Sequence, residues 1–206
     1  MIRDPKDLKR YDPAERANHW VVGISFILLA LSGLALFHPA FFPLSQLFGG
    51  PVWDRILHPY VGVLMAVSFL AMFFRFWRLN KMTRADREWL SKVGSMVSGD
   101  DHNMPEQGKY NGGQKVLFWA LVVSMLLMTV SGVLMWRAWF NVDVTLVRIA
   151  VVVHAAAGAF MIGLIMVHIY AAIWVKGTVR AMWYGTVTRA WAKQHHRGWY
   201  RQVTRK

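Results

Sequence analysis

The sequence predicts an all-α integral membrane protein, a four-transmembrane-helix bundle with both termini in the cytoplasm and an amphipathic C-terminal tail helix there. Three observations lead to this prediction. Hydrophobic residues make up 55% of the 206 residues and charged residues 17%, whereas a soluble domain has about 25% charged residues. Asp, Glu, Lys and Arg are missing from four long stretches, and the basic residues gather in alternate connections. The four stretches are 20–37, 56–74, 116–136 and 149–175.

Each stretch is long enough to cross a bilayer. At 1.5 Å per residue a helix over each stretch reaches roughly 27 to 40 Å, against a hydrocarbon core of about 30 Å. A soluble protein could bury one such helix, but four in so small a chain leave no residues for a soluble shell. We therefore expect a single membrane domain over residues 1–206. The first stretch begins 19 residues into the chain and lacks a clear small-residue cleavage site, which argues against a signal peptide.

The basic residues indicate how the helices are oriented. Of the 24 Lys and Arg residues, 21 lie in the N-terminal arm, at the end of the second stretch, in the loop 78–115 or in the tail 176–206. Cytoplasmic segments of membrane proteins carry an excess of Lys and Arg, so both termini are expected in the cytoplasm. The net charge of +13 then needs no nucleic acid to explain it.

Two cytoplasmic segments have further features. Apolar and basic side chains alternate in the tail, which suits a helix lying on anionic lipid or docking a partner. The residues concerned are Val179, Met182, Val187, Ala190 and Trp191 on the apolar side and Arg180, Arg189 and Lys193 on the basic side. The loop 78–115 is polar and rich in glycine, and it is too long for a plain connection, which hints at a function.

Four of the eight histidines lie in the predicted spans. A polar side chain inside a membrane is costly unless it has a partner, so each is a candidate functional residue. These four are His19, His58, His154 and His168, whereas we expect no special role for the loop and tail histidines His38, His102, His195 and His196.

The spacing of the four histidines predicts two facing pairs. His154 and His168 are 14 residues apart, which is 40° short of four helical turns and a rise of about 21 Å, so they lie on one face at opposite ends of the last span. Because the spans alternate in direction, His58 pairs with His154 near the outer side, and His19 pairs with His168 near the cytoplasm. Paired imidazoles in a helix bundle are typical of haem ligation, so the sequence predicts two haems b.

Other readings of these histidines are open. They could hold copper or zinc, or relay protons, but the chain has no cysteine and no carboxylate in any span. A small residue follows each histidine by four positions, on the same helix face, where a flat porphyrin needs room. Small residues also let membrane helices approach closely, which is the alternative explanation. The four are Gly23, Gly62, Gly158 and Ala172.

Several motifs resemble those of one family over nearly the whole chain. They include Glu15-Arg-Ala-Asn-His19-Trp20, Arg55-Ile-Leu-His58-Pro59, Gly108-Lys-Tyr-Asn111-Gly112-Gly-Gln114-Lys115, Ser131-Gly-Val-Leu-Met-Trp136-Arg137 and Trp191-Ala-Lys-Gln-His195-His196. The chain resembles the gamma subunit, or cytochrome b subunit, of membrane-bound respiratory formate dehydrogenases. One departure is Arg197, where the family pattern has a proline.

The resemblance implies specific sites. His58 and His154 would hold the outer haem, nearest an iron–sulfur subunit, and His19 and His168 would hold the inner haem. A quinone, either menaquinone or ubiquinone, would bind beside the inner haem near three residues of the loop. These three are Asn111, Gly112 and Gln114.

The residue types at this quinone site agree with the resemblance. An amide donates a hydrogen bond to a carbonyl, and glycine lets the backbone come close. A plain turn before the third span would use the same residues. No carboxylate lies next to the motif in the sequence, so water from the cytoplasm is the expected proton source.

The resemblance therefore implies a membrane electron-transfer subunit of a formate dehydrogenase complex in the bacterial inner (cytoplasmic) membrane. Electrons would pass from the iron–sulfur subunit through two b haems to a quinone reduced near the cytoplasmic side. Formate would be oxidised on a partner subunit that carries a molybdenum or tungsten pterin. The alternatives are the cytochrome b subunit of a hydrogenase or of another quinone-linked dehydrogenase, or a passive membrane anchor without redox role.

Four basic residues near the span ends have two possible roles. An Arg fork matches a haem propionate, and long basic side chains also reach the lipid headgroups. The four are Arg16, Arg75, Arg137 and Lys176.

Overall fold

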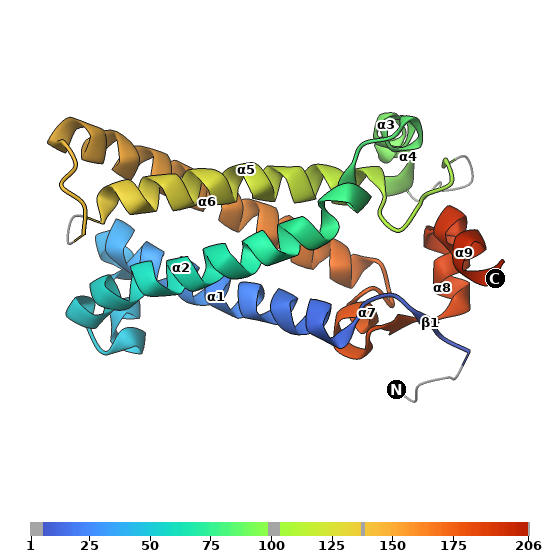
Figure 1. Ribbon diagram of the computed structural model, residues 1–206, viewed down its shortest axis with the longest axis horizontal. Helices are drawn as coiled ribbons and strands as arrows, with labels where there is room; N and C mark the ends of the chain where they lie inside the picture. Colours follow the sequence, from blue (N-terminus) through green and yellow to red (C-terminus); the bar gives the residue numbers. More distant parts are fainter. Residues whose placement is uncertain (1–5, 99–103, 137–138, 206) are drawn as a thin grey trace. The chain divides into compact units, whose positions relative to one another are not determined.

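The computed structural model describes residues 6–98, 104–136 and 139–205, and four long helices dominate it (Figure 1). They are α1 (Pro13–Phe37), α2 (Pro51–Phe76), α5 (Gly112–Met135) and α6 (Val144–Trp174). Each contains nearly all of one predicted span, and all four are long and apolar enough to cross a membrane. The prediction of an all-α protein with four membrane helices is thus confirmed.

The long helices begin before the charge-free stretches do. α1 starts at Pro13, where the fixed φ of proline suits a first helical turn and its missing N–H costs nothing. Many of their large apolar side chains are exposed, among them Ile24, Val152 and Ile173. Exposed apolar surface on helices of this length is what a lipid solvent requires.

Short elements connect or follow the long helices. After α1 comes the 3₁₀ helix η1 (Pro39–Phe48), and after α2 come η2 (Trp77–Asn80), α3 (Arg84–Ser91) and α4 (Val93–Val97). The tail contains α7 (Val179–Tyr184), β2 (Thr186–Val187), α8 (Arg189–His195) and α9 (Arg197–Thr204). The strand β1 (Leu8–Lys9) of the N-terminal arm pairs antiparallel with β2, with Leu8 opposite Val187.

The prediction of one amphipathic tail helix is wrong. α7 ends at Gly185, whose φ of +79° favours glycine and whose added Cβ would lie 2.7 Å from the carbonyl oxygen of Tyr11. A new helix then starts beyond β2, where the Thr188 hydroxyl accepts the N–H of Trp191. Val187 and Trp191 are buried. Part of the apolar side of the tail therefore belongs to a small protein core, while Val179 stays exposed.

The contacts of the chain group into two compact units. The first unit contains Met1–Arg16, Phe74–Ala120 and His168–Lys206, and the second contains Ala17–Phe73 and Leu121–Val167. The core of the first unit is made by the tail and the N-terminal arm, with Val187, Trp191 and Trp199 packed against Leu8 and Tyr11.

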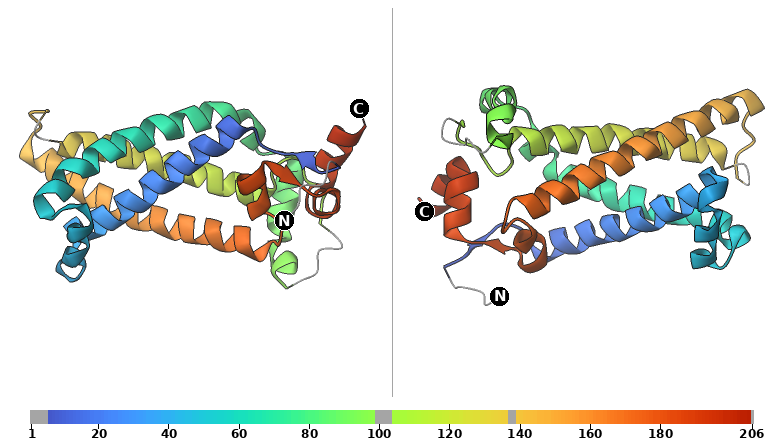
Figure 2. Two further views of the ribbon diagram at one scale, coloured as in Figure 1. Left: turned by 90° about the horizontal axis from the view of Figure 1, so that it is seen from below. Right: turned by 180° about the vertical axis from the view of Figure 1, so that it is seen from behind.

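In the second unit, parts of all four long helices lie side by side (Figures 1 and 2). Its core draws residues from each of them: Val22, Met65, Phe69, Met125 and Met161.

Candidate functional site

The structure brings the rings of His58 and His154 together in the second unit, with the edge of one ring toward the other. His58 lies on α2 and His154 on α6, their ring centroids are 6.3 Å apart, and the ring planes make an angle of 64°. A metal ion bonded to one nitrogen of each ring at about 2 Å would hold the two ring centres roughly 6 Å apart. The observed separation therefore fits one ion held between two imidazoles.

A serine hydroxyl contacts each of these imidazoles. Ser32 Oγ lies 2.7 Å from His58 Nδ1 and 2.8 Å from the carbonyl oxygen of Leu28. Ser131 Oγ lies 2.9 Å from His154 Nδ1 and 2.6 Å from the carbonyl oxygen of Leu127.

These contacts assign the tautomer of both imidazoles. A hydroxyl has one proton and a carbonyl can only accept, so each serine donates to its carbonyl and accepts the N–H of Nδ1. The lone pair of each imidazole is then on Nε2, the state that binds a metal.

The glycines that follow the outer histidines leave room beside the rings. A Cβ added to Gly62 would meet Leu29 at 4.0 Å, and one added to Gly158 would meet Met128 at 3.7 Å, which are ordinary contacts. At Gly23, after His19, an added Cβ would meet no atom within 4 Å in the described part of the chain. Close helix approach therefore does not require glycine at these positions.

The predicted inner pair is divided between the two units. His19 lies near the start of α1 in the second unit, and His168 lies on α6 in the first. Because α6 is continuous from Val144 to Trp174, His154 and His168 do share one helix face, about 21 Å apart along the axis. The pairing of His19 with His168 stays a prediction.

The quinone candidates form the start of α5. The Asn111 side-chain oxygen accepts the N–H of Gln114 at 2.9 Å, and the Gln114 side-chain oxygen accepts the N–H of Asn111 at 3.0 Å. This reciprocal exchange is a capping box. It occupies the oxygen ends of both side chains and leaves their amide nitrogens outside the exchange, and these nitrogens are the atoms that could donate to a quinone carbonyl.

The packing of α3 against α5 explains why position 112 is a glycine. A Cβ added there would lie 2.6 Å from the carbonyl oxygen of Asp86, so only glycine allows α3 to pack against the start of α5. This packing explains the glycine without any ligand.

A buried carboxylate lies beside this motif, where sequence analysis found none. Asp86 on α3 accepts a hydrogen bond from Lys115 Nζ at 2.6 Å, and both residues are buried. Burial by itself raises the pKa of Asp86, but hydrogen bonds from Lys115 and Thr83 outweigh it and leave the pKa below its usual value. Asp86 therefore stays ionised and paired. Its capping box with Thr83 was the available sequence signal.

A tail histidine fastens the loop before Asn111. His196 is buried, its Nδ1 donates to the carbonyl oxygen of Gly108 at 2.8 Å, and its Nε2 accepts from Arg10 at 3.3 Å. The Arg10 guanidinium lies 4.9 Å from the ring centres of both Trp191 and Trp199. Burial and the nearby Arg10 charge lower the pKa of His196 to about 3.

The expectation that His196 has no special role is thus wrong in structural terms. The motif of two tryptophans around a histidine pair was the signal for this cluster.

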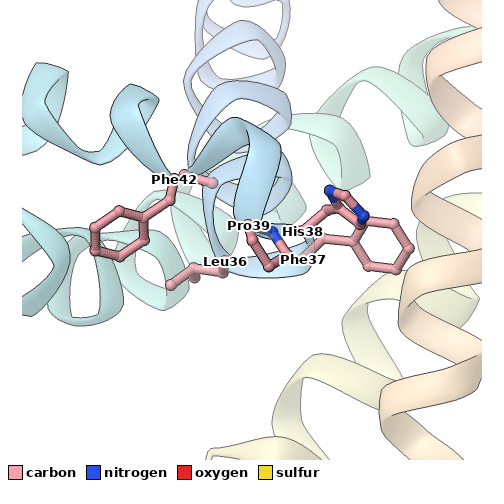
Figure 3. Close-up of a pocket in the computed structure, with 6 residues that line it drawn as sticks. Leu36, Phe37, His38, Pro39 and Phe42 are labelled. Carbon is pink, nitrogen blue, oxygen red and sulfur yellow. The ribbon is translucent and has the colours of Figure 1, made fainter.

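His38, in the connection after α1, lines a hollow of about 350 Å³ in the second unit (Figure 3). Its walls are the end of α1 and the start of η1, from Ala35 to Pro39, and Phe42. His38 Nδ1 accepts the N–H of Ala40 and caps η1. The hollow is apolar apart from this engaged imidazole.

Two of the basic residues at the span ends have protein partners. Arg16 donates to the carbonyl oxygen of Trp183 at 2.7 Å, and Arg75 donates to Glu15 at 2.6 Å. Arg137 and His102 lie outside the described residues.

The sequence is similar to those of known proteins over most of its length. Residues 10–185 match the family described as prokaryotic cytochrome b561. The chain belongs to this family. Membership makes it a membrane b-type cytochrome of the bacterial cytoplasmic membrane, with four apolar helices that cross the bilayer. The separation and tautomers of His58 and His154 fit an ion held between them, which a b-type haem would supply.

Individual relatives are similar over almost their whole length. The chain is 46% identical over 196 residues to the cytochrome b556(fdo) subunit of a formate dehydrogenase of Escherichia coli strain K12, covering 94% of this chain and 92% of that protein. It is 41% identical to the cytochrome b556(Fdn) subunit of the nitrate-inducible enzyme of the same strain, over 92% and 88% of the two chains.

The chain is also 37% identical to the cytochrome b556 subunit of a formate dehydrogenase of Haemophilus influenzae, over 98% of this chain and 85% of that protein. The resemblance to formate dehydrogenase cytochrome b subunits is confirmed.

Proposed function

We propose that this chain is the membrane electron-transfer subunit of a formate dehydrogenase complex. Electrons pass from an iron–sulfur subunit through two b haems to a quinone, which is reduced near the cytoplasmic side. A partner subunit with a molybdenum or tungsten pterin oxidises formate. The facing pair of His58 and His154 carries the proposal, because a passive anchor has no use for two half-buried imidazoles held at a metal-binding separation.

Each histidine pair has the same task in this proposal. His58 and His154 bind the iron of the outer haem through Nε2, and His19 and His168 bind that of the inner haem. When bound, b haems supply one-electron redox centres whose potential depends on ligands and surroundings. The protein holds the ligands, excludes water from them and keeps them neutral.

The quinone site is proposed at the start of α5. The amide nitrogens of Asn111 and Gln114 are donors for a quinone carbonyl, and their capping box holds them at the helix end. The excess of basic residues in the loop and tail supports a cytoplasmic position for this end of the chain and for both termini. Protons from the cytoplasm then complete the quinol.

The test is the haem content of the purified chain, measured by a pyridine haemochrome assay and a dithionite-reduced minus oxidised spectrum. We expect two haems b per chain. His154→Ala should lose one haem and block electron entry, and His168→Ala should lose the other together with quinone reduction. His38→Ala is the matched control and should keep both. A folded wild-type preparation without haem would leave only the passive anchor.

A further inference from the structure

The dipeptide Ser-Gly occurs in α1 and again in α5, and both copies contact an outer histidine in the same way. Ser32 and Gly33 contact His58, and Ser131 and Gly132 contact His154. In each copy the serine hydroxyl contacts Nδ1, and a Cβ added to the glycine would lie 3.4 Å from Cε1 of the same ring. We call these two dipeptides the Ser-Gly clamps.

We propose that the Ser-Gly clamps position the two axial ligands of the outer haem and set its redox potential. Ser32 and Ser131 fix the direction and tautomer of the imidazoles and make them stronger electron donors to iron. Gly33 and Gly132 lie at the edge of each ring, where an added Cβ would already be in van der Waals contact with Cε1. This inference rests on the proposed function, since it requires a haem between His58 and His154.

In each clamp, the hydrogen bond that the serine donates strengthens the hydrogen bond that it accepts. The serine donates its proton to the backbone carbonyl four residues earlier, at 2.8 Å for Ser32 and 2.6 Å for Ser131. Donation makes the hydroxyl oxygen a better acceptor, and that oxygen accepts the imidazole N–H. An acceptor on the second ring nitrogen raises the basicity of a metal-bound histidine. A more basic ligand favours ferric iron and so lowers the potential.

The clamps are buried and local. Ser32 is 2% exposed and Ser131 is 3% exposed, so water does not compete for their hydrogen bonds. Ser32 and His58 are 26 residues apart, and Ser131 and His154 are 23 apart, on helices that follow one another in the chain apart from the short η1. Each pair of helices therefore carries its own clamp, and both clamps lie within the second unit.

The usual behaviour of serine in a helix explains only some of the contacts of the Ser-Gly clamps. Serine inside a helix often bonds the carbonyl four residues back, with no further role. This common hydrogen-bonding pattern accounts for the contacts of Ser32 and Ser131 with backbone carbonyls. It does not account for an imidazole on each of the two hydroxyls, or for a glycine next to each serine at the edge of the same ring.

The chain offers matched controls for the two serines. Ser25 and Ser124 lie seven residues before Ser32 and Ser131 and are buried to a similar degree, 3% and 2% exposed. Seven residues are 20° short of two helical turns and rise about 10 Å, so each control shares the helix face of its clamp serine. Ser25→Ala and Ser124→Ala remove an equally buried hydroxyl farther from the outer histidines.

The experiment is a potentiometric titration of the haems in the purified chain, with the EPR spectrum of the ferric state. The outer haem is the component missing in His154→Ala. Ser32→Ala and Ser131→Ala should keep two haems b, shift the outer midpoint potential upward and change the EPR line shape. Ser32→Thr and Ser131→Thr keep a hydroxyl that can bond the same carbonyl and should return both values toward wild type. Ser25→Ala and Ser124→Ala should match wild type.

The possible outcomes separate this inference from the proposed function. A wild-type chain without haem defeats the proposed function. Two haems in wild type, with an unchanged outer potential and EPR spectrum in both alanine variants, overturn the clamps alone. Equal shifts in the control variants overturn them too. If the alanine variants lose the outer haem, its retention in the threonine variants supports the clamps and its loss there overturns them.

Discussion

The buried ion pair that joins α3 to α5 offers a quantitative test of the fold around the quinone candidates. Lys115 Nζ lies 2.6 Å from Asp86 Oδ2 and donates to the carbonyl oxygen of Lys81 at 3.1 Å. Their side chains are 8% and 3% exposed. Lys115→Met keeps an unbranched stem that fills the same space, but it removes the charge. Asp86 is then left as a buried carboxylate with Thr83 as its remaining side-chain partner.

The expected cost follows from this geometry. Removing one partner of a buried ion pair destabilises a protein by about 3–5 kcal/mol, because the other charge stays buried without compensation. At 1.36 kcal/mol per factor of ten, that is about 2.2 to 3.7 orders of magnitude in an opening equilibrium. Since Asp86 belongs to α3 and Lys115 to α5, the loss should appear first as opening of α3.

Amide hydrogen exchange of Arg84–Ser91 in detergent measures this opening. Lys115→Met should lose protection there by up to the factor above, while amides in the middle of α5 keep theirs. Lys92→Met is the matched control, because Lys92 makes an exposed pair with Glu88 at 2.9 Å, and such a pair contributes about 0.3–0.5 kcal/mol.

Two outcomes would contradict a role of this ion pair in holding α3 on α5. One is equal exchange of α3 in Lys115→Met and Lys92→Met. The other is a double variant, Asp86→Asn with Lys115→Met, that shows no recovery over Lys115→Met alone, although it no longer buries an unpaired charge.

Two further predictions concern the same unit. Asn111→Ala should keep both haems but weaken quinone binding, and it should lower the stability of the α5 start by about 1 kcal/mol because it removes the cap. Quinol-oxidation kinetics measure the effect on quinone binding, and thermal unfolding measures the effect on stability. Loss of a haem in this variant would contradict the site assignment. The stability of the first unit should fall from about pH 6.5 toward pH 3, because the unfolded chain protonates His196 near pH 6.5 while the folded pKa is about 3. His196→Asn should flatten the slope of unfolding temperature against pH in this range, and an equal slope in both proteins would argue against this origin.

Sequence analysis predicted the features that depend on local composition and helical period. A membrane helix must be apolar over a fixed length, so the four spans are visible without any tertiary contact. The shared face of His154 and His168 follows from 3.6 residues per turn once the helix is known to be continuous, as α6 is. The facing of His58 and His154 followed from the alternating direction of the spans. The inner pair rests on the same argument.

The tail and the loop before α5 were beyond this kind of reasoning. The tail was predicted as one helix because its apolar and basic residues alternate, but Val187 and Trp191 are buried against an arm from the other end of the chain. Asp86 was overlooked as a neighbour of the quinone motif because it precedes Gly112 by many residues in sequence, and only the packing of α3 brings its carbonyl oxygen to that glycine.

Where the chain crosses the membrane, which histidines lie in the spans and how the outer two are paired could all be predicted from the residues alone. These properties depend on hydrophobic length and helical periodicity, which each segment carries on its own. Only the tertiary structure decided which hydroxyl holds each outer imidazole, which tautomer that hydroxyl imposes and which buried charge stands beside the start of α5. Such contacts join side chains from different helices, and their existence depends on the relative rotation and depth of those helices rather than on the residues of either one alone.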